Sequence, residues 1–245
     1  NYALRHCLSP TLGSKVLNYM LSDWRPALRP DIKTFNILIR SGTVMRHSCV
    51  VEQALSVLWR NPKNNILLST KAATPARLLN PAAQVLNVSW TKYVRRGEIP
   101  EMDAVTLSAY IIYLSTTGQP YQIVQILALL MPGLQHHQNL PLHARKALRE
   151  SHLRMAVGLG PHVLTTILTA LCKAGKIGLA ERVWLLALSA EWASNNPEYG
   201  HRPWSLPIHA YTIMLQCYGT QVYKRGHVVG WGRPLPFGDK VRLQR

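Results

Sequence analysis

The chain has 245 residues, enough to bury a core in one extended repeat array or in one or two compact domains. It carries 28 Lys and Arg against 11 Asp and Glu, a formal net charge of +17, which favours a polyanionic partner such as RNA, DNA or an anionic membrane. The four cysteines form no CxxC pair, and the most apolar stretch, 123–134, is interrupted by Gln125 and Pro132, which argues against a zinc module, a dense disulfide framework and a membrane span.

Apolar residues recur at i, i+3, i+4 and about i+7 in four segments, which predicts four amphipathic helices. In chain order the stripes are Phe35, Leu38 and Ile39; Leu107, Tyr110, Ile111 and Leu114; Leu164, Ile167, Leu168 and Leu171; and Tyr211, Met214, Leu215 and Tyr218. A short polar residue directly follows the first position of every stripe. These four residues, called the marker residues below, are Asn36, Ser108, Thr165 and Thr212.

A second apolar stripe follows two of these predicted helices at a fixed distance. It begins at Ile123 and at Ala180, in both cases 15 residues after the marker residue. A glycine, Gly118 or Gly175, lies ten residues after the marker, where we expect the first helix to end and the chain to reverse. Each unit is therefore predicted to be a helical hairpin, which has to stack on its neighbours to bury its apolar face.

Three segments resemble the pentatricopeptide repeat. They are 168–180, LTALCKAGKIGLA; 102–127, which follows the same consensus without a gap; and 29–40, RPDIKTFNILIR, which matches its opening. The Trp, Leu-Gly and Tyr signature of tetratricopeptide repeats is absent. The resemblance implies an all-α protein, a right-handed α-solenoid of stacked helix-turn-helix hairpins over 1–222 with irregular insertions and an extended basic tail at 223–245.

The resemblance also implies where the repeats lie. Candidate repeats are at about 1–31, 32–60, 104–135, 160–195 and 207–222, with a degenerate repeat in 61–103 and an insertion in 136–159. We expect the second helix of the degenerate repeat at about 82–96. The insertion contains a basic helical sequence, for which a solvated face is the alternative to a binding face.

In this family one repeat generally meets one base of a single strand. By resemblance the marker residues occupy the fifth repeat position, which reads the base, and Asp31 and Asp103 match the partner position that closes a repeat. Gly160 and Pro207 stand at that partner position without a side chain able to hydrogen-bond. A short polar residue near a helix start also serves as a cap or a local hydrogen-bonding group, which is the alternative for the markers. The resemblance implies base stacking or phosphate contact for the second-position residues Lys33, His162 and His209.

Basic side chains are expected to contact phosphate and to add salt dependence rather than sequence specificity. The candidates are Arg40, Arg46, Lys92, Arg95, Arg96, Arg145, Lys146, Arg149, Lys173 and Lys176. The tail is rich in Gly, Pro and basic residues, so we expect it to become ordered on binding RNA or protein. Its candidate contact residues are Lys224, Arg225, Trp231, Arg233, Lys240, Arg242 and Arg245.

No catalytic motif of the HExxH, Walker or GxSxG type is present, and the acidic residues are few and scattered. We therefore predict no enzyme activity, no cofactor and no metal site. The resemblance implies a protein of the mitochondrial matrix that binds single-stranded mRNA or rRNA and acts in RNA maturation, stability, translation or ribosome function. The alternative is a protein-binding scaffold or assembly factor for a mitochondrial complex, either a respiratory complex or the mitoribosome.

Overall fold

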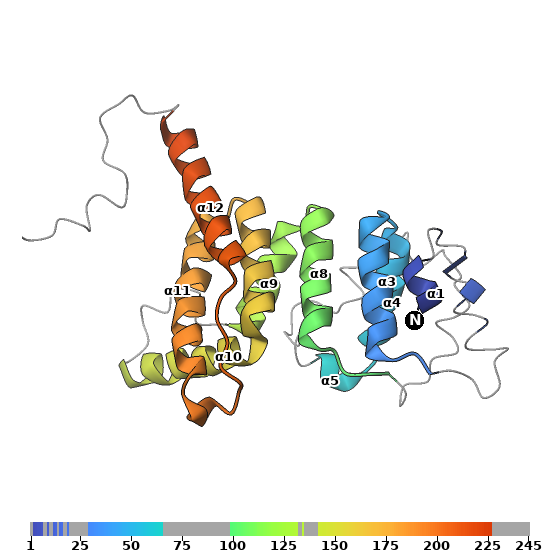
Figure 1. Ribbon diagram of the computed structural model, residues 1–245, viewed down its shortest axis with the longest axis horizontal. Coiled ribbons are helices and arrows are strands. Elements are labelled where there is room, and N and C mark those ends of the chain that lie inside the picture. The colour runs from blue at the N-terminus through green and yellow to red at the C-terminus, as the bar shows by residue number, and fades with distance from the viewer. Residues whose placement is uncertain are drawn as a thin grey trace, which may run out of the picture.

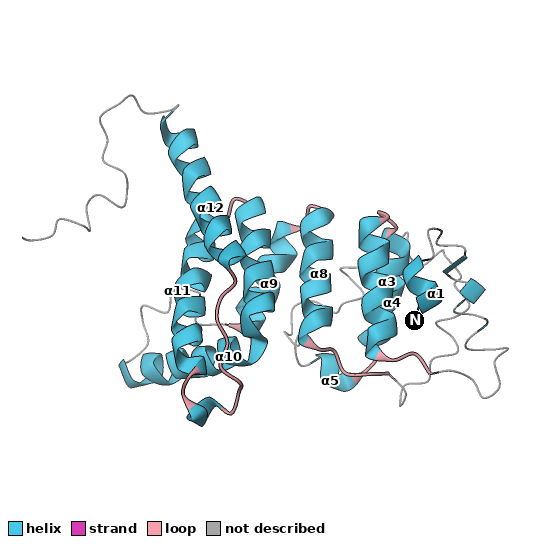
Figure 2. Ribbon diagram, viewed as in Figure 1, coloured by secondary structure: helices cyan, strands magenta, loops and turns pink. Residues whose placement is uncertain are grey.

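The computed structural model describes residues 2–6, 9, 12, 13, 15, 16, 19, 29–65, 99–131, 134 and 142–226. Regular structure within these ranges is helical throughout, which confirms the expected all-α class (Figure 2). The helices are α1 (Tyr2–His6), α3 (Ile32–Val44), α4 (Ser48–Leu58), α5 (Pro62–Asn65), α8 (Ala104–Thr116), α9 (Pro120–Leu130), α10 (Leu142–Lys173), α11 (Ile177–Ser194), the 3-10 turn η5 (Pro197–Tyr199) and α12 (Ile208–Gly226).

Helix α10 consists of two helices joined at a kink. Gly160 has φ 74° and ψ 173°, outside the helical region, and Pro161 follows it. Proline fits the first position of a helix because its missing N–H would have no partner there. The part of α10 before the kink lies in the expected insertion, whereas the part from Pro161 to Lys173 carries the marker Thr165 and is the expected first helix of the 160–195 unit.

Three hairpins reverse direction in the same way. The hairpins are α3 with α4, α8 with α9, and the second part of α10 with α11, and the residue ten positions after each marker has a positive φ: 57° at Arg46, 70° at Gly118 and 68° at Gly175. The amide of the next residue donates to the carbonyl five residues before it, at 2.8 Å for His47 and 2.9 Å for Gln119 and Lys176. This is the Schellman arrangement that closes a helix end. The predicted turns at Gly118 and Gly175 are confirmed.

Arg46 adopts at its turn a conformation that the other two turns give to glycine. A Cβ in the left-handed region costs roughly 1 kcal/mol, a penalty that glycine escapes. Arg46→Gly should therefore raise the free energy of unfolding by about 0.5 to 1 kcal/mol, measured by urea denaturation. The reciprocal change, Gly118→Ala, should lower it by a similar amount, since no heavy atom lies within 4 Å of an added Cβ there and only φ is strained. A loss of stability in Arg46→Gly would contradict this account.

The second helices begin at matching positions too. Ser48, Pro120 and Ile177 each stand 12 residues after the marker of their hairpin. Val51, the counterpart of Ile123 and Ala180, is fully buried and starts the stripe of α4. The stripe has the spacing of the other two in the sequence, although it is not among the second stripes predicted above.

The first helices of successive units pack against one another in a row. Helix α3 packs on α8, α8 on α10, and α10 on α12, while α1 packs against α3 at the other side (Figure 1). One continuous hydrophobic cluster joins the described helices from Leu4 to Met214. The row therefore buries apolar faces between consecutive units as well as within each hairpin.

The direct packing of α3 on α8 bears on the degenerate repeat expected in 61–103. Any such repeat would have to lie outside the α3 to α8 contact, and the second helix expected at 82–96 lies outside the described residues, so the degenerate repeat stays a prediction. Buried Asn64 connects the residues before and after the segment between α5 and α8 through hydrogen bonds. Its Nδ2 donates to the carbonyls of Leu58 and Pro100, at 2.8 and 3.1 Å, and its Oδ1 accepts from the amide of Met102 at 2.8 Å. The described residues on the two sides of this segment, 58–64 and 100–102, therefore lie next to each other.

Two further features concern α10 and α12. By length and composition alone, Lys146–Lys173 of α10 is apolar enough to cross a membrane, but half of its most apolar window is buried in the structure, as in the core helix of a folded domain.

Helix α12 extends beyond Val222, the predicted end of the last repeat, to Gly226. The residues that follow Gly226 lie outside the described ranges.

Candidate nucleic-acid interface

Asp31 and Asp103 cap the first helices of two units with the same geometry. Asp31 Oδ1 accepts from the amide and hydroxyl of Thr34 at 2.8 and 2.6 Å, and Asp103 Oδ1 accepts from those of Thr106 at 2.7 Å each. A carboxylate at this position satisfies an amide that has no partner inside the helix. In α3 and α8 the cap is therefore the aspartate, and the marker residue, five positions further on, is not needed for it.

Asn36 and Asp103 connect two consecutive units. The Asn36 Nδ2 donates to Asp103 Oδ1 at 3.3 Å, although the two residues are far apart in sequence. Asn36 is buried, and among the described residues its Oδ1 has no hydrogen-bond donor. A buried acceptor without a donor is costly, and in native structures such atoms usually find a partner. Because protein atoms enclose this oxygen, a ligand can reach it only if the surrounding side chains move.

The charge of Asp103 is set by its hydrogen bonds. Partial burial alone would raise its pKa, but hydrogen bonds from the Thr106 hydroxyl and amide and from Asn36 stabilise the carboxylate, so that its pKa is lowered from the ordinary value of 3.8. Asp103 is consequently ionised at neutral pH. The Asn36 and Asp103 pair therefore offers hydrogen-bond acceptors and a negative charge, which suits an N–H donor.

The other three marker residues differ in their surroundings. Ser108 and Thr165 are buried, whereas Thr212 is exposed on α12. The hydroxyls of Thr165 and Thr212 donate to the backbone carbonyls four residues back, Pro161 at 2.7 Å and Ile208 at 3.1 Å. These two side chains make the local hydrogen bond that is the alternative to base reading, and each retains acceptor capacity on its oxygen.

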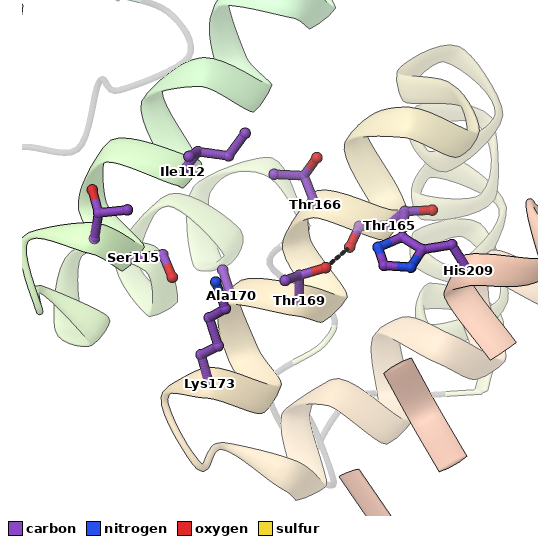
Figure 3. A pocket seen from close by; sticks show the side chains of 9 residues that line it. Ile112, Ser115, Thr165, Thr166, Thr169, Ala170, Lys173 and His209 are labelled. Atoms are coloured by element: carbon purple, nitrogen blue, oxygen red, sulfur yellow. Dashed lines mark hydrogen bonds between the residues drawn. The ribbon is translucent and has the colours of Figure 1, made fainter. Parts of the chain in front are cut away.

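A hollow of about 330 Å³ lies between α8, α10 and α12 (Figure 3). It brings together Thr165, Lys173 and His209, three residues that the sequence assigned to separate roles. The Thr169 hydroxyl, also at the hollow, donates to the Thr165 carbonyl at 2.8 Å. The remaining lining residues are Ile112, Ser115, Thr116, Thr166 and Ala170.

The sequence predictions missed the hydroxyl groups of this hollow. Thr169 stands four residues after the marker Thr165, and Ser115 stands seven after the marker Ser108. Residues at these spacings lie on the same side of a helix. A search of the sequence for hydroxyl side chains four or seven residues after each marker would therefore have found them. The structure places them in one hydroxyl-rich surface.

The basic candidates fall into several groups. On α3, Lys33 and Arg40 are exposed, and Arg40 stands one turn after Asn36. His162 and His209 are exposed in the first turns of their helices, and Lys176 is exposed at the turn after Lys173. Arg46 is exposed at the α3 to α4 turn. Basic side chains or histidines therefore lie before and after the marker residues along the first helices.

The remaining basic candidates are not brought to the markers by any described contact. Lys146 and Arg149 are exposed on the first part of α10, before the kink, and the backbone of Arg145 lies beside them. Lys224 and Arg225 are in the last turn of α12, where the structure describes the backbone alone. Lys92, Arg95, Arg96, Trp231, Arg233, Lys240, Arg242 and Arg245 lie outside the described residues.

Comparisons of the chain with protein-family models, curated proteins and solved structures found no match. Within the described part of the chain, no three His, Cys, Asp or Glu side chains are grouped to hold a metal ion. The surface is instead one of amide, hydroxyl and basic groups along the first helices.

Proposed function

We propose that the chain is a pentatricopeptide-type α-solenoid that holds single-stranded RNA along its row of first helices. Three hairpins with equal turn positions and equal starts of the second helix support the solenoid. So does the order of packing, in which each first helix contacts the next. Such an array offers an extended surface with one recognition position per unit.

The observation that carries the proposal is the Asn36 and Asp103 pair. Asn36 at a fifth repeat position and Asp103 at a closing position, both of which the family resemblance assigns to base reading, meet at 3.3 Å across a gap of 67 residues in the chain. Asn36 is buried, but Asp103 beside it is exposed, and its carboxylate can accept a hydrogen bond from the ring or amino N–H of a base edge. The Asn36 amide would hold this carboxylate in position for the base.

Phosphate contacts supply the larger, sequence-independent part of the affinity. Lys33, Arg40 and Lys173 lie exposed on the marker-bearing helices, and the hydroxyl-rich hollow beside Lys173 also takes part in the surface. With a net charge of +17, the chain attracts a polyanion over a distance beyond these contacts. We propose mitochondrial mRNA or rRNA as the ligand, in the matrix, with a role in RNA maturation, stability or translation.

A second function, that of a protein-binding scaffold or assembly factor for a mitochondrial complex, is favoured by one observation. Gly160 and Pro207 stand at closing positions and offer no hydrogen bond to a base. Only the first described unit therefore has a complete pair of reading side chains. A protein that reads few bases has need of another source of specificity, which a protein partner would supply.

A charge reversal at the hollow tests the RNA proposal. Lys173→Glu should weaken binding of a single-stranded RNA by about five- to tenfold, because one phosphate contact becomes a repulsion. The matched control is Arg202→Glu, which changes the net charge equally on the exposed connection between α11 and α12 and should weaken binding less than twofold. Fluorescence anisotropy with labelled RNA measures both. Equal losses in the two variants would show that only the overall charge matters.

A further inference from the structure

The threonines of the hollow between α8, α10 and α12 present oxygen lone pairs rather than hydroxyl protons. The hydroxyls of Thr166 and Thr169 donate to the backbone carbonyls four residues back, those of His162 and Thr165, at 2.8 Å each. A hydroxyl has one proton and two lone pairs, so a threonine that uses its proton within its own helix can still accept a hydrogen bond. A ligand that meets these oxygens therefore has to donate.

The opposite wall of the hollow, on α8, carries a hydroxyl of a different kind. The hydroxyl of Thr116 donates to the carbonyl of Tyr113 at 2.8 Å, but Ser115 makes no hydrogen bond within the part of the chain that the structure describes. The Ser115 hydroxyl is consequently able to donate as well as to accept. A ligand group that donates to the α10 wall and accepts from the α8 wall is itself a hydroxyl.

Lys173 adds a positive charge beside these hydroxyls. It is exposed and stands one turn after Thr169, about 6 Å along the helix axis. Side chains of a helix lean toward its N-terminus, and Figure 3 shows the Lys173 side chain extending back toward Ala170. The described residues that line the hollow include no carboxylate. A phosphate bound by Lys173 would therefore lie close to the Thr169 oxygen.

The chemistry of an RNA strand limits which of its groups can lie there. Phosphate oxygens only accept hydrogen bonds, whereas base N–H groups and the ribose 2′-hydroxyl can donate. The 2′-hydroxyl is on the carbon next to the one that bears the 3′ phosphate, while the base edge lies on the far side of the sugar. The volume of about 330 Å³ is near the lower limit of ligand sites, roughly 300 to 1,000 Å³, and suits one nucleotide.

We propose that the hollow binds one ribose of the RNA strand and so distinguishes RNA from DNA. The 2′-hydroxyl donates to the Thr169 oxygen and accepts from the Ser115 hydroxyl, while Lys173 binds the adjacent phosphate. The inference rests on the proposed RNA binding and adds to it a group that selects the sugar. The 2′-hydroxyl is what lets a protein separate the two nucleic acids at a given site.

The first test compares three single strands of one sequence on the full chain by fluorescence anisotropy. They are RNA, DNA with uracil in place of thymine, and RNA in which fluorine replaces every 2′-hydroxyl. Fluorine keeps the sugar pucker of RNA but has no proton to donate. We expect RNA to bind about three- to tenfold more tightly than either of the other two strands, which is the range for the loss of one hydrogen bond.

The second test removes the hydroxyl on the protein side. Thr169→Val keeps the shape of the side chain and should weaken RNA binding about three- to tenfold while leaving DNA binding within twofold. The matched control is Thr169→Ser, which keeps the hydroxyl and should keep the preference for RNA. Because the comparison of strands on the unchanged chain needs no variant, it stands even where Thr169→Val does not fold.

The outcomes separate this inference from the proposed function. Equal affinity of the unchanged chain for RNA and DNA, or binding of the 2′-fluoro strand as tightly as RNA, would overturn the inference and leave single-strand binding in place. An equal loss of RNA and DNA affinity in Thr169→Val would overturn it too, since Thr169 would then not select the sugar. If neither RNA nor DNA binds, the proposed function fails and the inference fails with it.

Discussion

Replacing Ile111 with aspartate should unfold the row of helices. Ile111 is fully buried in α8, the helix that packs against both α3 and α10 and against its own partner α9. A carboxylate at this position has neither water nor a hydrogen-bond partner. Its burial should lower the free energy of unfolding by more than about 4 kcal/mol, which is comparable with the whole stability of many domains. Circular dichroism during urea denaturation should show a chain that is largely unfolded without denaturant.

The neighbouring residue gives the control. Ile112→Asp introduces the same group one position along the same helix, but Ile112 is 43% exposed at the hollow, so the carboxylate keeps its water. Its free energy of unfolding should fall by less than about 1 kcal/mol. If the two variants unfold at the same urea concentration, α8 is not held in the row as described.

Changing the four marker residues together to alanine should remove the sequence preference of RNA binding. Each hydrogen bond from a marker contributes about 0.5 to 1.5 kcal/mol to discrimination between bases, so the loss of all four should reduce the ratio of affinities for preferred and disfavoured RNA by more than tenfold. The salt dependence should persist because the phosphate contacts are unchanged. Competition binding with homopolymer and mixed-sequence RNA measures the ratio.

The control for this variant removes comparable polar groups from the second helices and the turn after them. Ser56, Ser189 and Asn195 donate hydrogen bonds to backbone carbonyls there and have no assigned reading role. Their replacement by alanine should leave the RNA preference unchanged. If instead the preference survives the change of Asn36, Ser108, Thr165 and Thr212, those residues do not read bases.

Local features of the fold were predictable because their causes are local. A glycine ten residues after the marker and an apolar stripe with helical spacing gave the hairpins at Gly118 and Gly175 correctly. The sequence does not predict a turn at Arg46, because arginine rarely takes a positive φ. In the structure the ends of the two surrounding helices hold Arg46 in this conformation. The stripe that begins at Val51 shows that the first hairpin had the same pattern in weaker form.

Features that depend on contacts distant in sequence were not predictable. The spacing of 72 residues between Asn36 and Ser108 is close to two repeats and suggested an extra unit between them. The structure packs α3 directly on α8 and joins Leu58 and Pro100 through hydrogen bonds from Asn64, contacts that this spacing does not specify. The hollow likewise joins Thr165, Lys173 and His209 through the packing of α8, α10 and α12, which spacing within one helix does not specify.

The salt dependence of RNA affinity tests the central claim most directly. If Lys33, Arg40, Lys173 and Lys176 each neutralise one phosphate of a single strand, log Kd should rise with log salt concentration with a slope of about 3, so affinity should fall about fiftyfold between about 50 and 200 mM salt. Anisotropy titrations of the full chain with a single-stranded RNA give this slope. A loss of less than tenfold over that range would contradict a phosphate-binding row of helices.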